Sequence, residues 1–412
     1  MSALKVSVIL PIYNVEQYLP RALNSLLSQT FKDMEIICVN DCSPDGCLAI
    51  IEKFCQTDRR IRLINLPANH GQGYCRNLAI EQAQGDYIMF LDPDDWLEDN
   101  AIEVAYNQIW HNQNDFVMFG FNSCYEDTGE VVEQTYWLQP FAQCLNEPNI
   151  KLSSLKTNYM QNAYSVCRIY SRSFLNRYNI RYSDDRIDQD NIFVVNAFIS
   201  ADNISLIPQA LYNYRIHKRS TSFNTKLWQG MIDARRKSYC LLQYRQVNAS
   251  YMRMFLQYLI PALCYWMKRF SAADAAIAED LYNYVRRFFQ QIAVEQPKHY
   301  LRNVENYAEF CHIIRYPYGW IKMQAKLLAV LRWLFEVRNI KSGNVKHKLI
   351  TILGFRFEIN HISLSKNPTG GGYWRENTTN WCIKLTLWSA RLLFGYRRLL
   401  IGEYCNVKSI PD

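Results

Sequence analysis

The chain has 412 residues and 49% of them are apolar, so it can bury a sizeable core, and the usual domain length of about 100–200 residues predicts two or three domains. Its 13 cysteines are odd in number and contain no C-x-x-C pair, which argues against a disulfide framework or a zinc site and favours a reduced protein. The net charge of +8 is uneven: residues 1–210 carry 15 Lys and Arg against 26 Asp and Glu, a net −11, whereas residues 211–412 carry +19. This asymmetry predicts an anionic partner for the second half, either a membrane surface or a nucleic acid.

The chain opens on a strand pattern rather than a signal peptide, and no apolar run reaches the roughly 18 uncharged residues of a membrane-spanning helix. Four short apolar runs predict strands, at residues 5–10, 34–39, 61–66 and 87–91. A helix is predicted after each of the first three, from the leucine spacing of 16–29, after the turn residues 40–46, and through the stretch 76–83. This alternation predicts an α/β fold with a mostly parallel sheet and helices on both faces.

Polar loops follow these strands, at residues 11–14, 40–45, 69–73 and 92–95. Because the carboxyl ends of parallel strands meet at one edge of a sheet, where ligands bind, the four loops predict one site. The last loop, DPDD, offers carboxylates that could hold a hard divalent cation against a diphosphate. The alternative is ordinary turn and helix-capping chemistry, which also favours Asp.

Three stretches carry a resemblance to a known family: SVILPIYNVEQYLPRALNSLLSQTF, EIICVNDCSPDG and NHGQGYCRNLAIEQAQGDYIMFLDPDD. In this order and at this spacing they resemble the nucleotide-sugar-binding half of family 2 glycosyltransferases. The resemblance covers residues 5–120 closely and continues more loosely to about residue 222. It implies a GT-A fold, which is a Rossmann-like, mostly parallel sheet, and a UDP-sugar donor held with Mn²⁺ or Mg²⁺.

The resemblance implies that Pro11, Tyr13 and Asn14 line the nucleotide base, which agrees with the ability of an aromatic ring to stack on a base. Asp41 matches the family aspartate that accepts a hydrogen bond from the uracil ring N–H, and an acceptor there selects uracil over cytosine. The alternative is that Asp41 caps the following helix, although Asp45 can fill that place.

Arg76 and Asn77 match the Arg-Asn pair of the family. Arg76 is expected to bind phosphate or ribose and to order the base-binding loop, the alternative being a surface arginine. Asn77 is expected to line the donor site or to brace the same loop. Asp92 and Asp94 form a D-x-D pair that would hold Mg²⁺ or Mn²⁺ and stabilise the leaving UDP, with Asp95 as an additional carboxylate of the site.

The stretch YSVCRIYSRSFLNRYNIRYSDDRIDQDNIF resembles the acceptor-side segment of the family, in which a Glu-Asp pair opens a helix and its Asp is the catalytic base. The matching pair is Gln189-Asp190, so we expect Asp190 to be the base, with Asp188 as the second candidate. Gln189 removes one negative charge beside the base, which is expected to lower the pKa of Asp190. Asp188 could instead cap the helix.

The stretch LYNYRIHKRSTSFN at 211–224 forms a dense cationic loop. The resemblance implies that this segment closes over the donor. Arg215 is then expected to stabilise the leaving group, and His217 to ligate the metal or contact the diphosphate. The alternative is a basic loop that faces a membrane or the acceptor.

We predict a GT-A domain over residues 1–225 and a mostly helical, basic region over 226–412, with a subdomain break near 340–372. Residues 321–335 and 381–400 are expected to form basic amphipathic helices. Such helices suit an anionic membrane surface, or equally an ordinary core with solvated basic edges.

Two shorter features interrupt this region. Residues 346–359 predict a short β element, and the three glycines at 370–372 predict a loop.

Together, the residues and the resemblance predict an inverting glycosyltransferase, a hexosyl- or N-acetylhexosaminyltransferase. It would move a sugar from a UDP-sugar to a saccharide or glycolipid acceptor in bacterial surface glycan synthesis, such as lipooligosaccharide or capsule. We expect a cytoplasmic protein that is peripheral at the inner face of the membrane. The sequence does not predict the donor sugar, the linkage or the oligomeric state.

Three alternative functions fit the sequence less well. A nucleotidyltransferase normally carries a Gly-rich, basic phosphate loop after its first strand, and PIYNVEQYL has neither feature. A non-catalytic membrane-surface scaffold could keep the fold, but the carboxylates of a working site are present. A nucleic-acid-binding protein would use the basic half, yet the sequence contains no recognition motif for nucleic acid.

Overall fold

The computed structural model describes residues 4–145, 147–152, 164–185, 189–217, 227–302, 304–323, 335–342, 345–352 and 355–360. The chain divides into two compact units, Met1–Ile314 and Arg315–Asp412, and each is described separately below.

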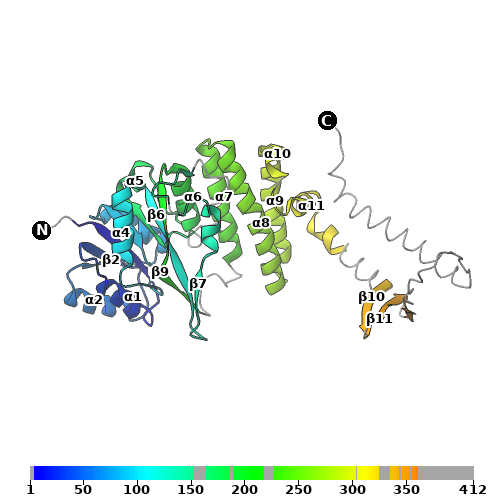
Figure 1. The fold of residues 1–412 in the computed structure, drawn as a ribbon, viewed down its shortest axis with the longest axis horizontal. Coiled ribbons are helices and arrows are strands. Elements are labelled where there is room, and N and C mark those ends of the chain that lie inside the picture. The colour runs from blue at the N-terminus through cyan, green and yellow to red at the C-terminus, as the bar shows by residue number, and fades with distance from the viewer. Residues whose placement is uncertain are drawn as a thin grey trace, which may run out of the picture. The chain divides into compact units, whose positions relative to one another are not determined.

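Among the described residues of the first unit, nine strands form one sheet in the order β3-β2-β1-β4-β8-β6-β9-β5, with β7 paired to β6 (Figure 1). The strands are β1 (Val6–Ile12), β2 (Met34–Asn40), β3 (Ile61–Asn65), β4 (Tyr87–Phe90), β5 (Trp96–Leu97), β6 (Phe116–Tyr125), β7 (Val131–Gln134), β8 (Arg168–Ser171) and β9 (Ile204–Ile216). The neighbours β3, β2, β1 and β4 run parallel, whereas β8 runs antiparallel to both β4 and β6. The prediction of an α/β fold is therefore confirmed, but the sheet in the described residues is mixed and not mostly parallel, since four of its strand pairings are parallel and four are antiparallel.

The parallel part of the sheet forms where the apolar runs predicted it. All seven residues of β1 and all seven of β2 are buried, as expected for central strands covered on both faces. The predicted strands at 5–10, 34–39, 61–66 and 87–91 correspond to β1, β2, β3 and β4. Their carboxyl ends lie at one edge, so the loops after β1, β2 and β4 can contribute to one site.

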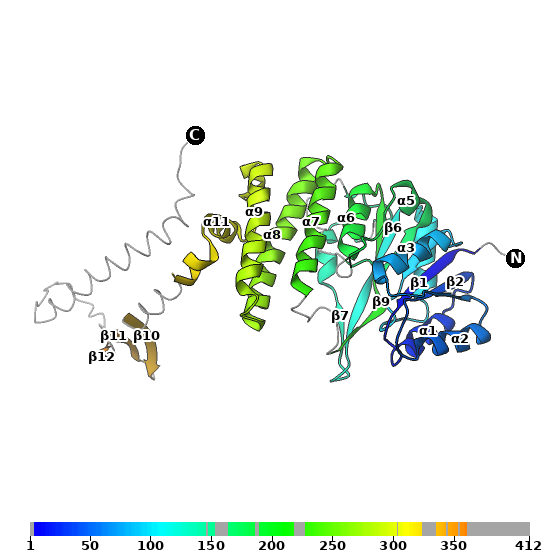
Figure 2. The same ribbon diagram turned by 180° about the vertical axis from the view of Figure 1, so that it is seen from behind.

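Six helices surround this sheet in the described residues. They are α1 (Leu19–Leu27), α2 (Cys47–Thr57), α3 (Gln72–Gln82), α4 (Ala101–Asn112), α5 (Arg172–Arg177) and α6 (Asp190–Ser200). The chain steps from β1 to β2 to β3 and then reverses to β4 on the far side of β1, so right-handed crossovers place α3 on the face opposite α1 and α2. Figure 2 looks onto α3, which is hidden behind the sheet in Figure 1.

α1 begins later than the predicted helix over 16–29. Val15 to Tyr18 form a turn, in which the Tyr18 N–H donates to the Val15 carbonyl (2.9 Å), and Pro20 then stands in the first turn of the helix, where its missing N–H costs nothing. The buried Leu19 and Leu23 confirm the predicted apolar face.

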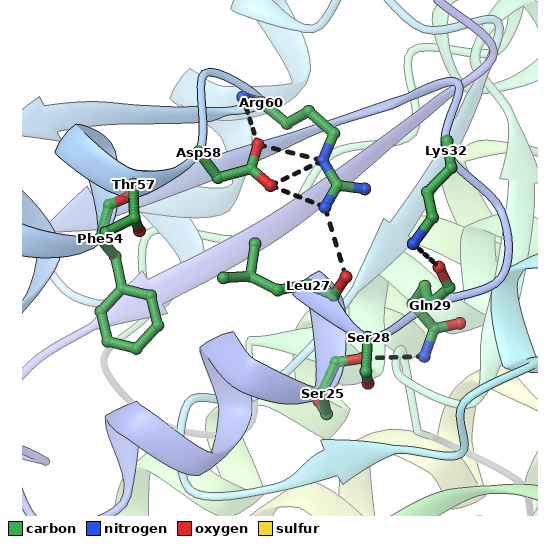
Figure 3. A network of polar contacts seen from close by, with 9 residues as sticks. All are labelled: Ser25, Leu27, Ser28, Gln29, Lys32, Phe54, Thr57, Asp58 and Arg60. Carbon is green, nitrogen blue, oxygen red and sulfur yellow. Dashed lines mark hydrogen bonds and ion pairs between the residues drawn. The ribbon is translucent and has the colours of Figure 1, made fainter.

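A small polar network fixes the end of α1 against the turn between α2 and β3 (Figure 3). Asp58 and Arg60 form an ion pair at 2.8 Å, and the guanidinium of Arg60 also donates to the carbonyl of Leu27 (3.4 Å). This carbonyl belongs to the last turn of α1, where backbone acceptors have no helical partner. The network stabilises this corner of the domain, away from the strand ends that form the site.

The helical region begins inside the first unit. It contains α7 (Trp228–Tyr244), α8 (Ala249–Ala273), α9 (Ala278–Glu295), α10 (Lys298–Leu301) and α11 (Tyr307–Arg315), the last of which reaches the boundary of the unit. α7 packs on α6, and α8 and α9 pack on α7 in turn, which both views show (Figures 1 and 2). The helices after residue 225 pack against the sheet domain and belong to the same compact unit. The predicted domain boundary near residue 225 therefore stays a prediction.

In the second unit, β10 (Phe335–Ser342), β11 (Val345–Ile352) and β12 (Phe355–Asn360) form an antiparallel sheet. This agrees with the β element expected at 346–359. Of the helix expected over 321–335, residues 321–323 are helical, residues 324–334 lie outside the described part, and Phe335 begins β10 instead of ending a helix. The amphipathic stretch 381–400 and the glycines at 370–372 lie outside the described residues. No helix in the described part of the chain is long and apolar enough to cross a membrane.

Candidate active site

The loop after β2 is tied to the loop before α3 by one buried carboxylate. Asp41 accepts the backbone N–H groups of His70 (2.7 Å) and Gly71 (2.8 Å). Gly71 has a φ of 92°, a conformation that a side chain rarely adopts, so this loop needs glycine here. Capping of α2 falls to Asp45, which accepts the N–H of Cys47 (3.2 Å), so the capping alternative for Asp41 is wrong.

The predicted base-binding residues lie at the end of β1. Pro11 is buried within the strand, whereas the Tyr13 side chain is 45% exposed and Asn14 is exposed with a φ of 55°. The Asn14 N–H donates to the Ser43 hydroxyl (3.4 Å) in the loop after β2. Tyr13 and Asn14 therefore lie at the same edge of the sheet as Asp41, with the aromatic ring accessible to a ligand.

Asp95 stabilises the DPDD turn through its backbone and its side chain. Its N–H donates to the Asp92 carbonyl (3.0 Å), and its buried carboxylate accepts the Tyr212 hydroxyl (2.6 Å) and the Arg215 backbone N–H (2.7 Å). Burial, with the charges of Asp94 and Asp92, raises the pKa of Asp95 well above its usual value. Asp95 thus ties β9 to the turn, and both of its oxygens have partners within the protein.

Arg76 connects the two sides of the site. Its side chain is 3% exposed, so the surface alternative is wrong, and it donates to Asp92 at 2.5 Å. Burial lowers the pKa of Arg76, but the charges of Asp92, Tyr182 and Asp190 outweigh it and raise that pKa. Burial raises the pKa of Asp92, which Arg76 opposes and Asp94 reinforces. The guanidinium therefore lies in the field of two carboxylates, Asp92 after β4 and Asp190 at the start of α6.

Asn77 braces the segment that leads to α6. Its side-chain amide donates to the Tyr182 carbonyl (3.0 Å) and its oxygen accepts the Tyr182 N–H (2.9 Å), as a paired strand would. The Tyr182 ring stacks on Phe193 of α6 (ring centroids 4.2 Å apart, 15° between planes) and faces the Arg76 guanidinium at 5.0 Å. Asn77 therefore braces the segment before α6 and not the base-binding loop that it was expected to brace, and its predicted place in the donor site stays a prediction.

Replacing Asn77 by Ala is expected to lower the free energy of unfolding by about 1–3 kcal/mol, because it leaves a buried backbone donor and acceptor of Tyr182 unpaired. Denaturant unfolding measures the change. Asn24→Ala, an exposed position on α1, is the matched control and is expected to stay within about 0.5 kcal/mol of the wild type. Equal losses in the two variants would contradict the brace.

Asp190 is the first residue of α6, with Gln189 at the N-cap. Burial raises the pKa of Asp190 to about 6, Asp92 adds to the rise, and Arg76 and Arg168 oppose it. Burial therefore dominates the net shift, and the expectation that Gln189 lowers this pKa relative to a Glu at the same position stays a prediction. A carboxylate with this pKa can accept a proton near neutral pH.

Of the other carboxylates in this segment, Asp185 is engaged elsewhere. It pairs with Lys237 of α7 (2.5 Å) and accepts the Ser183 hydroxyl (2.8 Å). Asp188, the second candidate for the base, lies outside the described residues, and the N-cap of α6 is Gln189. Asp190 is therefore the base candidate that the described geometry supports.

Arg215 lies near the end of β9 and His217 directly follows the strand, and both side chains contact the DPDD turn. The Arg215 Nε donates to the Asp94 carbonyl (2.8 Å), and His217 Nε2 lies 3.2 Å from Asp94 Oδ2. The pairing of β5 with β9 holds this arrangement in register, with Trp96 opposite Asn213. The cationic residues predicted near the donor therefore contact the carboxylate loop itself.

The structure thus gathers Asp92, Asp94, Asp95, Arg215 and His217 at one strand end. In the described ranges no group of three His, Cys, Asp or Glu side chains is arranged to hold a metal ion. Sequence reasoning missed several contributing residues: Tyr18, Trp96, Glu126, Tyr182 and Tyr212. Trp96 follows the DPDD turn, and Tyr18, Tyr182 and Tyr212 lie within the recognised stretches, although nothing in those stretches singled them out. Glu126 lies outside these stretches and joins the site through contacts distant in sequence.

Comparison with known proteins identifies the domain. The model of the family described as Glycosyl transferase family 2 matches residues 7–178. Glycosyltransferase GlyA of Streptococcus pneumoniae is 28% identical over 245 residues, which cover 58% of this chain and 34% of GlyA. Poly(ribitol-phosphate) beta-N-acetylglucosaminyltransferase TarS of Staphylococcus aureus is 28% identical over 215 residues, 51% of this chain and 35% of TarS. The matched region thus spans only about a third of the length of either relative.

Solved structures extend the likeness of fold. The crystal structure of S. aureus TarS 1–349 in complex with UDP has a TM-score of 0.62 at 20% identity, covering 83% of this chain and 96% of that one. The same fragment in complex with UDP-GlcNAc has a TM-score of 0.64 at 19% identity, with the same coverage. Residues 7–178 therefore match the family 2 glycosyltransferase model, and the chain shares the GT-A fold of these solved structures.

Proposed function

We propose that this protein is an inverting glycosyltransferase that moves a sugar from a UDP-sugar to a hydroxyl of a saccharide or glycolipid acceptor. The observation that carries the proposal is the Arg76 centre, where one buried guanidinium pairs with Asp92 at the donor-side turn and lowers the pKa of Asp190 at the start of α6. Such a centre joins a leaving-group site to a proton acceptor, which a displacement at a sugar carbon requires.

The donor is proposed to be a UDP-hexose or UDP-N-acetylhexosamine. The TarS structures that share the fold were determined with UDP and UDP-GlcNAc. In this chain, Tyr13 offers an exposed ring for the base, and Asp41 lies at the same strand ends with free lone pairs beyond its two backbone donors. Pro11 and Asn14 complete the base-side group.

The chemical step follows from the position of Asp190. Its carboxylate takes the proton of the acceptor hydroxyl as the oxygen forms a bond to the anomeric carbon. The bond from that carbon to the diphosphate oxygen breaks, and UDP leaves with the bonding electrons from the opposite face. An α-linked donor therefore yields a β-linked product, and Arg215, with its guanidinium beside the turn, stabilises the charge on UDP.

Two carboxylates at the turn suit a divalent cation whose remaining ligands would come from the donor diphosphate and water, since no three side chains in the described residues are already arranged as ligands. Asp92 and Asp94 are half-buried carboxylates close enough that the charge of Asp94 raises the pKa of Asp92, a repulsion that a dication relieves. Mn²⁺ and Mg²⁺ prefer such oxygen ligands, and His217 stands beside Asp94 as a further candidate ligand. When bound, the cation supplies a Lewis acid that offsets the charge of the leaving diphosphate.

We further propose that the acceptor is a growing bacterial surface glycan, of the lipooligosaccharide, capsule or teichoic-acid kind, modified on the cytoplasmic side of the membrane. Named relatives act on cell-surface polymers such as poly(ribitol-phosphate). Every cysteine in the described part of the chain is free, which suits a reducing compartment. Attachment to anionic membrane rests on residues 381–400, outside the described part of the chain.

A donor screen tests the function. Purified protein with Mn²⁺ is given a panel of UDP-sugars and a saccharide acceptor mixture, and both UDP and pyrophosphate are quantified. Acceptor-dependent release of UDP from one donor is expected. Pyrophosphate release in its place would point to a nucleotidyltransferase, and no binding of UDP or of any UDP-sugar would leave a scaffold that kept the fold.

A further inference from the structure

Arg215 is held in place by groups other than a ligand. Its Nε donates to the Asp94 carbonyl (2.8 Å), and its guanidinium lies over the rings of Tyr18 (4.7 Å) and Trp96 (4.9 Å). The side chain is 11% exposed. Because these contacts use one N–H and the faces of the guanidinium, they leave its terminal nitrogens to contact an anion.

The carboxylate that approaches these nitrogens is Glu126, at the tip of β6. Its Oε1 lies 3.7 Å from the Arg215 Nη1, beyond ordinary hydrogen-bond length, and its Oε2 accepts the Tyr18 hydroxyl (3.2 Å). Its backbone N–H donates to the Ile216 carbonyl (3.1 Å), which fixes the base of the side chain beside β9. The carboxylate is 43% exposed, so it can turn to solvent without breaking the fold.

A second arginine, Arg21, increases the positive charge around Arg215. The Arg21 guanidinium lies 3.4 Å from the centre of the Trp96 ring, on which Arg215 also rests. Burial lowers the pKa of Arg21, and the charge of Arg215 lowers it further, as expected for two cations held close together. Asp94 and Asp95 of the turn also lie close to Arg215, but the carboxylate that faces its terminal nitrogens is that of Glu126, at a long distance. A more strongly charged anion bound at these nitrogens would therefore compete with Glu126.

Building on the proposed function, we propose that Glu126 is a positioning residue that stands in for the donor diphosphate. In the donor-free protein it partly neutralises Arg215, and the diphosphate displaces it on binding. Each binding event must release Glu126, so its charge weakens the affinity for UDP and thereby favours departure of the product. The reverse role, in which Glu126 is needed to hold Arg215 for the donor, predicts the opposite change in affinity.

Glu126→Gln separates these roles, because the amide keeps the size of the side chain and an acceptor for Tyr18 but removes the charge. Calorimetric titration of the full chain with UDP and Mn²⁺ at low salt is expected to give a Kd about two- to fivefold lower than that of the wild type, the range of an exposed ion pair. The gain is expected to shrink as salt rises. A Kd that is unchanged or higher overturns the proposal.

Two further variants make the result specific. Glu130→Gln removes the same charge from an exposed position in the same hairpin and is expected to leave the Kd of UDP unchanged. In an Arg215→Gln background, Glu126→Gln is expected to give no gain. A gain that persists there, or an equal gain in Glu130→Gln, would show general charge repulsion and overturn the stand-in role.

The wild type is the reference for both proposals. If it does not bind UDP, the proposed function fails together with this inference. If it binds UDP and Glu126→Gln matches it, only the inference fails. Should Glu126→Gln melt far below the wild type, Glu126→Asp is used instead, since its shorter side chain withdraws the charge from Arg215 and predicts a smaller gain of the same sign.

Discussion

Replacing Asp190 by Asn is expected to reduce sugar transfer by at least about 100-fold, the scale of lost general-base catalysis, with the Kd of UDP little changed. The amide has the shape of the carboxylate but does not accept a proton near neutral pH. Asp190 lies at the start of α6, in a different part of the chain from the loops after β1, β2 and β3, so the change is expected to leave those loops intact. Initial rates of UDP release, with UDP titrations alongside, measure both quantities.

The pH dependence of the wild-type activity also tests whether Asp190 is the base. Because the pKa of Asp190 is raised to about 6, kcat/KM is expected to rise with pH through that value and then level off. Stability changes with pH in the opposite direction. The folded state holds the proton of Asp190 more tightly than the unfolded chain does. The contribution of protonated Asp190 to the free energy of unfolding is therefore full below the ordinary pKa of 3.8 and is lost as pH rises through about 6.

It follows that Asp190→Asn is expected to be at least as stable as the wild type at pH 7.5, although it is inactive. Thermal melts check this, and a variant that melts well below the wild type would mean that activity was lost through unfolding. Asp188→Asn is the matched control two residues away. If that variant loses activity and Asp190→Asn stays active, the base is Asp188.

Replacing Asp94 by Asn is expected to abolish cation-dependent transfer, with a loss of about 100-fold or more, since a Lewis acid at the diphosphate contributes several kcal/mol to the transition state. The fold should survive, because the side chain is 31% exposed and the bond from Arg215 goes to the Asp94 backbone carbonyl, which Asn keeps. Rates measured with and without Mn²⁺, after treatment with EDTA, separate the cation-dependent part.

Asp127→Asn, an exposed position beyond the tip of β6, is the control for loss of one negative charge and is expected to keep wild-type activity. Full activity of the wild type in excess EDTA would refute a role for the cation. Full activity of Asp94→Asn with Mn²⁺ would instead show that Asp92 and the remaining groups suffice.

The parallel half of the sheet was predictable because each of its strands is marked by the residues of that strand alone. Runs such as the buried β1 and β2 are apolar along their whole length, and the polar residues that follow them must lie at the strand ends. The register and the antiparallel strands were not predictable in this way. β8 is four residues long and pairs with both β4 and β6, which no pattern within those four residues specifies.

The same limit applies to the site. Asp41, Asp92 and Arg215 stood within recognisable motifs, but the brace between Asn77 and Tyr182 joins residues 105 positions apart, and its existence depends on how the sheet closes. The pKa of Asp190 shows the limit for electrostatics. The neighbour at position 189 bears only on a difference between Gln and Glu, whereas the net rise of this pKa comes from burial of the carboxylate, which the sequence does not show.

The packing around Gly73 has a consequence for engineering. A Cβ built on this residue of α3 would come within 2.4 Å of the Ser183 carbonyl oxygen and 3.0 Å of Gln189, while Gln72 and Gln189 are hydrogen-bonded at 3.1 Å. The helix after β3 and the segment before α6 therefore meet here in close contact. A chimera that grafts residues 164–217 of another glycosyltransferase onto this chain, to change the acceptor, would have to bring α3 of the same parent with it.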